Sequence, residues 1–273
     1  MLKQLDVTNR RSMTLSLEML ENDTGYQIAD IDGLDPVKAT LVSTSFATMD
    51  GSQFQSARRG ARNIKLILDL QPDFDVNTYT TLRKNLYTYF MPKSQVNLRF
   101  YQTSGLYLDI VGIVEEHSAP LFSEDPTVTI SLMCFQPDFV DPRMVTYEGN
   151  TVASGTTHAI DYPGTVESGT VLTLHVDRSL SAFTIYNTGE DGILQQLDFA
   201  ASLLDGDELV ISSIRGSKGI TLTRAAVSSS YLYGRTAQSA WIELIEGINQ
   251  FRVYALGDPI PYTLEYLVRY GGL

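Results

Sequence analysis

The chain has 273 residues, enough for one large all-β domain or two ordinary domains, and its 43% apolar residues can form a substantial core. Its net charge of −12 argues against a general nucleic-acid-binding protein, because contacts to phosphates need a positive field. Cys134 is the only cysteine, which excludes an intrachain disulfide and a cysteine-rich metal site.

Targeting signals are missing from the pattern as well. The N-terminal residues lack the apolar run of a signal peptide, and no stretch approaches the roughly 18 consecutive apolar residues of a membrane span. We therefore expect a protein that is made and kept in a reducing cytoplasm, or exported only as part of something larger, with no membrane as partner.

Short strands dominate the first half of the chain. The clearest is NIKLILDL (63–70), in which Ile64, Leu66, Leu68 and Leu70 share one face. Six further runs are rich in β-branched or aromatic residues: TLSLEML (14–20), YQIADIDGL (26–34), KATLVSTSF (38–46), VNLRFY (96–101), LYLDIVGIVEE (106–116) and TVTISLMCF (127–135).

One segment of the first half breaks the strand pattern. Apolar residues recur at helical spacing over 76–90, with Asp75 as the expected N-cap and Met91-Pro92 as the end. The residues that define this face are Val76, Tyr79, Leu82, Leu86 and Phe90. We predict an amphipathic helix that covers an apolar sheet face.

A linker is predicted at QPDFVDPRM (136–144), where periodicity stops. Beyond it, strands return at the spacing of a sandwich, and no convincing helix appears. They are HAIDYPG (158–164), TLHVDR (173–178), AFTIYNT (182–188), ILQQLDF (193–199), ELVISSI (208–214), GITLTRA (219–225), AWIELIEG (240–247), NQFRVYAL (249–256) and YTLEYLVRY (262–270). The prediction is a mainly β protein, with an N-terminal β-sandwich-like domain and its one α-helix over 1–140 and a C-terminal β-sandwich over 145–273.

Catalytic and metal-binding patterns are scarce. His117, His158 and His175 are scattered without metal-ligand spacing, and no phosphate loop or nucleophile elbow is present. We expect no enzyme activity, no metal and no cofactor. Trp241 and Glu243 share a strand face and form a possible glycan contact, although a partly buried structural tryptophan is the simpler interpretation.

Positive charge gathers at SARRGAR (56–62), just before the clearest strand. Arg58, Arg59 and Arg62 lie within five positions, in what we interpret as a polar turn. Such a cluster can pair with a neighbour's carboxylates and set the register of a contact. A solvated turn that contributes little energy is the alternative.

The order of these features resembles one family. IDGLDP (31–36) is followed by MDGS (49–52), SARRGAR, NIKLILDL, the helix and VNLRFY, and the chain finishes with GINQFRVYALGDPIPYTLEYLVRYGGL (247–273). This order resembles the distal tail proteins (Dit) of phages with long non-contractile tails.

The resemblance implies a ring-forming N-terminal β domain and a galectin-like or carbohydrate-module-like C-terminal sandwich. It also implies a structural virion protein that forms a hexameric ring at the tail tip after assembly in the host cytoplasm. The implied partners are the major tail tube protein, the tail-associated hub protein, the tape-measure protein and receptor-binding proteins. The arginines would then face a neighbouring subunit or the ring lumen.

A second interpretation belongs to another functional class. In it the protein is a lectin-like protein that recognises a host cell-surface glycan through its second sandwich. Mass in solution separates the two, because a hub protein forms a large ring whereas a lectin acts as a small unit.

Overall fold

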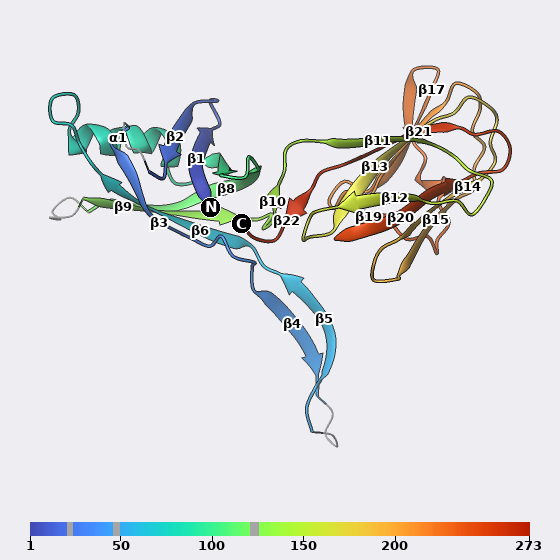
Figure 1. Ribbon diagram of the computed structural model, residues 1–273, viewed down its shortest axis with the longest axis horizontal. Helices are drawn as coiled ribbons and strands as arrows, with labels where there is room; N and C mark the ends of the chain where they lie inside the picture. The colour runs from blue at the N-terminus through green and yellow to red at the C-terminus, as the bar shows by residue number, and fades with distance from the viewer. Residues whose placement is uncertain (21–23, 46–49, 121–125) are drawn as a thin grey trace. The chain divides into compact units, whose positions relative to one another are not determined.

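The computed structural model describes residues 1–20, 24–45, 50–120 and 126–273 (Figure 1). Two positions of the predicted motifs, Phe46 in KATLVSTSF and Met49 in MDGS, lie outside the described residues. The chain forms two compact units, Met1–Asp141 with Gly271–Leu273 (unit 1) and Pro142–Tyr270 (unit 2). The predicted second domain runs to residue 273, but the last three residues belong to unit 1.

Unit 1 is built on an antiparallel sheet with the strand order β2-β1-β7-β8-β9-β6-β3. Its strands alternate between buried apolar and more exposed side chains, so one face forms the core. The strands are β1 (Leu2–Asn9), β2 (Thr14–Glu18), β3 (Tyr26–Asp32), β6 (Arg62–Leu70), β7 (Gln95–Gln102), β8 (Tyr107–Ser118) and β9 (Thr127–Cys134), with the short β10 (Phe139–Val140) beside β8.

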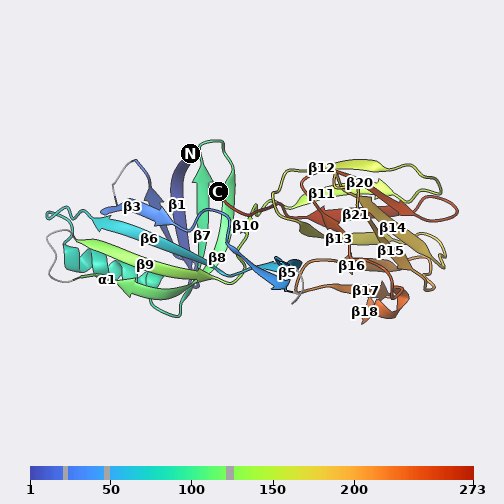
Figure 2. The same cartoon turned by 90° about the horizontal axis from the view of Figure 1, so that it is seen from below.

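Helix α1 (Tyr79–Phe90) lies on one side of this sheet (Figures 1 and 2). Leu82, Leu86 and Phe90 are buried, which confirms this part of the predicted apolar face, whereas Tyr79 is exposed. The hydroxyl of Tyr26 on β3 donates to the carbonyl of Leu82 at 2.9 Å and fixes the helix to the sheet.

The predicted start of the helix is wrong by three residues. Thr78 is the N-cap, and its side chain accepts from the Thr81 amide. Asp73 instead closes a turn with the amides of Val76 and Asn77, so Val76 lies outside the helix and is exposed. Asp75 is therefore not the cap.

Two strands of unit 1, β4 (Ala39–Thr44) and β5 (Gln53–Arg59), form a separate two-stranded sheet. This hairpin leaves the main sheet of unit 1 between β3 and β6 (Figure 1). The sequence predicts β4 but interprets the second half of β5 as a turn.

Unit 2 is a sandwich of two antiparallel sheets around one core. One sheet has the order β11-β21-β13-β16-β17-β18 with β19 beside β13, and the other has the order β12-β20-β14-β15. The elements are β11 (Val145–Asn150), β12 (His158–Tyr162), β13 (Ser168–His175), β14 (Phe183–Thr188), β15 (Leu194–Phe199), β16 (Glu208–Ser212), β17 (Gly219–Arg224), β18 (Val227–Ser230), η1 (Leu232–Gly234), β19 (Glu243–Leu244), β20 (Gly247–Tyr254), β21 (Pro261–Tyr266) and β22 (Arg269–Tyr270). The mainly β fold with a sandwich in the second half is confirmed.

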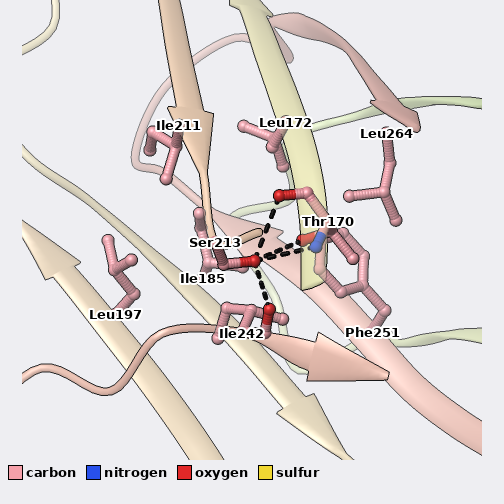
Figure 3. A pocket seen from close by; sticks show the side chains of 9 residues that line it. All are labelled: Thr170, Leu172, Ile185, Leu197, Ile211, Ser213, Ile242, Phe251 and Leu264. Atoms are coloured by element: carbon pink, nitrogen blue, oxygen red, sulfur yellow. Dashed lines mark hydrogen bonds between the residues drawn. The ribbon is translucent and has the colours of Figure 1, made fainter. Parts of the chain in front are cut away.

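The sandwich core contains a polar node around Ser213 (Figure 3). The buried hydroxyl of Ser213 accepts from the Thr170 amide at 2.8 Å, and the carbonyls of Thr170 and Ile242 both lie within reach of its single proton. Aliphatic and aromatic side chains line the small space around it, including Leu172 and Phe251. The Ser213 hydroxyl, the Thr170 amide and the two carbonyls are hydrogen-bonded to one another. Burying these polar groups therefore leaves none of them without a partner.

The segment predicted as a linker is held more firmly than its composition suggests. Phe139 is fully buried in unit 1 and contacts Phe100 edge to face, with 5.6 Å between ring centroids. Asp141 is also buried.

Across the described ranges, no helix is long and apolar enough to span a membrane.

Candidate functional site

The β4–β5 hairpin displays apolar side chains that nothing in the described part of the chain covers. Every residue of the two strands is exposed except Thr44 and Arg59, which are half-buried. Leu41 is 67% exposed and Phe54 is 63% exposed. An isolated two-stranded hairpin is marginally stable in water, so the exposed apolar side chains indicate a surface that a partner completes.

The register of the hairpin places one set of side chains on a common face. Thr40 lies opposite Arg58, and Val42 opposite Ser56, while a bulge follows Val42. Since side chains alternate along a strand, Ser56 and Arg58 of β5 share that face with Val42, whereas Phe54 beyond the bulge pairs with Ser43 and lies on the other face. Exposed Val42 and the exposed cation of Arg58 therefore lie on one face of the hairpin, and exposed Phe54 lies on the other.

Arg59 points to the other face and fixes the base of the hairpin. Its guanidinium makes a two-point ion pair with Asp138, in which Nη2 lies 3.2 Å from Oδ2. This fork-to-fork geometry is the strong form of an arginine–carboxylate pair. Arg59 therefore ties β5 to the segment before β10.

Arg62 is a structural residue and does not reach the surface. Only 2% of it is exposed, and it lies at the start of β6. Its guanidinium donates to the carbonyls of Gly33 at 2.6 Å, Asp35 at 2.7 Å, Pro137 at 2.7 Å and Gly271. Burial lowers the pKa of Arg62, and these carbonyls together with the charge on Asp138 stabilise its cation.

The IDGLDP motif is the cradle of that arginine. Gly33 has a φ of +87°, and a Cβ there would come within 2.0 Å of the Asn63 carbonyl oxygen. Only glycine fits this approach. Two of the motifs that carry the family resemblance thus meet at Arg62.

The prediction that Arg58, Arg59 and Arg62 form one polar turn is wrong. Arg58 and Arg59 belong to strand β5, and Arg62 opens β6 in the interior of unit 1. The three arginines are close together in the sequence. Arg58 and Arg59 nevertheless lie on opposite faces of the hairpin, and Arg62 is buried in unit 1. Of the three, Arg58 alone is exposed.

The structure places Trp241 and Glu243 among close neighbours. The guanidinium of Arg235 lies over the Trp241 ring at 4.9 Å. The carboxylate of Glu243 contacts Lys218 Nζ at 3.0 Å and Arg215 Nη2 at 3.7 Å. Both predicted glycan contacts already engage partners within unit 2.

The histidines do not come together. They lie on β8, β12 and β13, and within the described ranges no three His, Cys, Asp or Glu side chains are grouped to hold a metal ion. Cys134 is buried in β9, and burial raises the pKa of its thiol to about 11. It therefore behaves as an apolar core residue.

Residues 14–133 match the family described as the phage tail protein RIFT-related domain. This stretch belongs to that family. It comprises most of unit 1, including the β4–β5 hairpin, Arg62 and α1. No curated protein matches the chain significantly.

The phage tail domain and the unit that follows it also share a fold with a solved structure. The Dit protein of phage SPP1, described as a paradigm of the hub adsorption apparatus in phages that infect Gram-positive bacteria, is 14% identical. It aligns over 97% of this chain and 98% of that chain with a TM-score of 0.69. These findings confirm the resemblance to the distal tail proteins.

A weaker likeness is to a chain of the phage P2 baseplate in its activated conformation with calcium. It is 10% identical and aligns over 99% of this chain and 98% of that chain, with a TM-score of 0.47.

Proposed function

We propose that this chain is a structural, non-enzymatic subunit at the tip of a long non-contractile phage tail. Six copies form a ring that joins the end of the tail tube to the tail-associated hub and contacts the tape-measure protein. The ring carries receptor-binding proteins, is assembled in the host cytoplasm and resides in the virion. The observation that carries this proposal is an uncovered hairpin on a domain of a phage tail family.

The hairpin supports ring formation because its apolar side chains lack cover in their own chain. Burying a large apolar side chain contributes about 1.5–3 kcal/mol, and Leu41, Val42 and Phe54 are all exposed. A cyclic ring uses heterologous contacts, in which each subunit presents one surface and its neighbour presents the complement. A projecting hairpin suits such a contact.

The charge on the hairpin supports the same role. Arg58 shares the face of Val42, and the chain as a whole carries a net charge of −12. A neighbouring copy therefore offers an excess of carboxylates to this cation, which favours encounter and sets register. The second location for Arg58 is the ring lumen, opposite DNA or the tape-measure protein.

The test is the mass of the full-length protein in solution, measured by light scattering and native mass spectrometry. We expect a species of six times the monomer mass, alone or after addition of the tail tube protein. Phe54→Asp should leave a folded monomer, because it places a charge in the contact. Phe74→Asp is the matched control, since Phe74 is 71% exposed in the same unit but away from the hairpin.

Two outcomes contradict the proposal. One is a wild-type protein that stays monomeric even with the tail tube protein present. The other is a Phe54→Asp variant that assembles as well as the Phe74→Asp control. Circular dichroism on each variant separates loss of assembly from loss of folding.

A further inference from the structure

A hollow of about 240 Å³ lies at one end of the four-stranded sheet of unit 2. The segment between β13 and β14 lines one side, and the end of β20 lines the other. Pockets for drug-sized ligands span roughly 300–1,000 Å³. This hollow therefore suits a smaller group, of the size of a single sugar ring.

The walls of the hollow are held in place by Arg178. Its guanidinium donates to the carbonyls of Leu256 at 2.6 Å, Asp258 at 2.9 Å and Ser179 at 3.3 Å, which links the two lining segments. Gly257 has a φ of +95°, and a Cβ there would come within 3.1 Å of the same guanidinium. Leu180 exchanges two backbone hydrogen bonds with Leu203. The site is preformed, so ordering its residues adds little to the free-energy cost of binding a ligand.

The chemistry of the lining favours a neutral, hydroxylated ligand. Among the described residues that line the hollow there is no carboxylate. The guanidinium of Arg178 donates its hydrogen bonds to backbone carbonyls. What remains is the Tyr254 ring, the exposed Leu256 and the hydroxyls of Ser179 and Ser181. Hydroxyls both donate and accept, and an aromatic ring packs against the C–H face of a sugar.

A strip of similar chemistry continues from the hollow along the outer face of the sheet. Tyr254 pairs with Thr184, the next outward pair is Arg252 with Tyr186, and the third is Gln250 with Thr188. The Arg252 guanidinium lies 4.2 Å from the centre of the Tyr186 ring. The Nη1 of Arg252 also donates to the Ser154 carbonyl at 3.4 Å, which helps to hold the guanidinium in this position.

The polar groups beside this strip are already oriented. Asp198 on β15 accepts from Thr184 Oγ1 at 2.8 Å and from Gln196 Nε2 at 2.9 Å. Aromatic, amide and hydroxyl groups thus stand in fixed positions on one sheet face. This combination matches the edges and faces of a pyranose ring.

We propose that unit 2 binds the neutral sugar rings of a glycan on this face. One ring occupies the hollow and packs on Tyr254, and the following rings lie along the Arg252–Tyr186 strip. The site is distinct from Trp241 and Glu243, which already engage Arg235 and Lys218. It is independent of the proposed ring, because its residues lie in unit 2 and not on the β4–β5 hairpin.

The experiment is saturation-transfer NMR on the full-length protein. The probes are the methyl glycosides of glucose, galactose, N-acetylglucosamine and rhamnose, followed by maltotetraose and chitotetraose. We expect transfer to at least one monosaccharide. The matching oligosaccharide should bind about tenfold tighter, about 1.4 kcal/mol, because it also contacts the strip. Equal affinity for monomer and oligomer would restrict the site to the hollow and contradict the role of the strip.

Variants of Tyr254 test the location. Tyr254→Ala should weaken binding by about tenfold or more, and Tyr254→Phe should retain most of it because the ring remains. Tyr233→Ala is the matched control, since Tyr233 is 73% exposed in unit 2 but does not line the hollow. The inference is wrong if no probe shows transfer, or if Tyr254→Ala binds like the control. Ring formation by Tyr254→Ala should be unchanged in either case.

Discussion

Arg58 and Arg62 lie four positions apart on the chain, yet their surroundings are opposite. Arg62 is buried and donates to four backbone carbonyls from distant segments. Arg58 stands on an exposed face of the hairpin that it shares with Val42. A charge cluster in a sequence can therefore combine a residue that holds the fold with one that remains available to a partner.

The same contrast separates the β4–β5 hairpin from the sheet it leaves. The sheet buries its apolar side chains against α1 and within unit 1, so truncation there acts on the free energy of unfolding. The hairpin exposes its apolar side chains, so truncation there should act on assembly and leave the monomer stable.

The largest expected effect is on Arg62. Arg62→Ala leaves four carbonyls without their donor, and each unsatisfied buried acceptor costs about 1–3 kcal/mol. Because such losses are not additive, we expect a decrease of at least about 3 kcal/mol in the free energy of unfolding. Urea unfolding followed by circular dichroism measures it. Arg58→Ala is the matched control and should change stability by less than about 0.5 kcal/mol. Equal urea midpoints for the two variants would remove the contrast.

A second effect of similar kind is expected on α1. Leu86→Ala empties a fully buried position and should lower the free energy of unfolding by roughly 2–5 kcal/mol. Tyr87→Ala is the comparison, because the next side chain is 38% exposed and should cost clearly less. Thermal melts of the two variants that coincide would show that the helix does not close the core.

A smaller effect concerns pH. Burial lowers the pKa of His117 below its usual 6.5, and the nearby Arg83 lowers it further. Between the lowered pKa and 6.5 the unfolded chain holds more protons, so the free energy of unfolding should fall as the pH drops through that window. His117→Phe, beside the Tyr87 ring, should flatten this part of the stability profile. An unchanged profile in the variant would assign the pH dependence to other groups.

The smallest effect on the monomer, and a clear one on assembly, is expected for Arg58. Arg58→Glu should leave thermal unfolding unchanged, because the side chain is exposed. Assembly should weaken, since like charge then faces the carboxylates of a neighbour. Added salt should weaken the wild-type ring in the same direction, because charges are screened over about 8 Å at physiological ionic strength. Light scattering at low and high salt measures both. A ring that resists the reversal and the salt would move Arg58 away from the subunit contact.

The elements that the sequence predicts well are those with one buried face. β6 and α1 show their periodicity plainly because one side of each is in the core. β5 lacks that signal, since both of its faces are exposed and QFQSARR shows no apolar alternation. β1 is not predicted either. A bulge between Leu2 and Gln4 breaks the alternation of Leu2 with Leu5 and Val7.

The site residues were harder to predict for a related reason. The burial of Arg62 depends on carbonyls at positions 33, 35, 137 and 271, and no local pattern connects these positions. The glycan contact expected at Trp241 and Glu243 follows from their residue types alone. Their neighbours Arg235 and Lys218 come from other parts of unit 2, so the sequence does not reveal that both are engaged.

The division of the chain has a consequence for the order of its synthesis. Unit 2 is inserted into unit 1, whose last segment begins at Gly271 and supplies one of the four carbonyls around Arg62. The Leu273 amide also donates to the Leu34 carbonyl. A ribosome makes the chain from its N-terminus, so the cradle of Arg62 stays open until all of unit 2 has emerged. The cradle of Arg62 thus gains its fourth carbonyl only when unit 2 is already present.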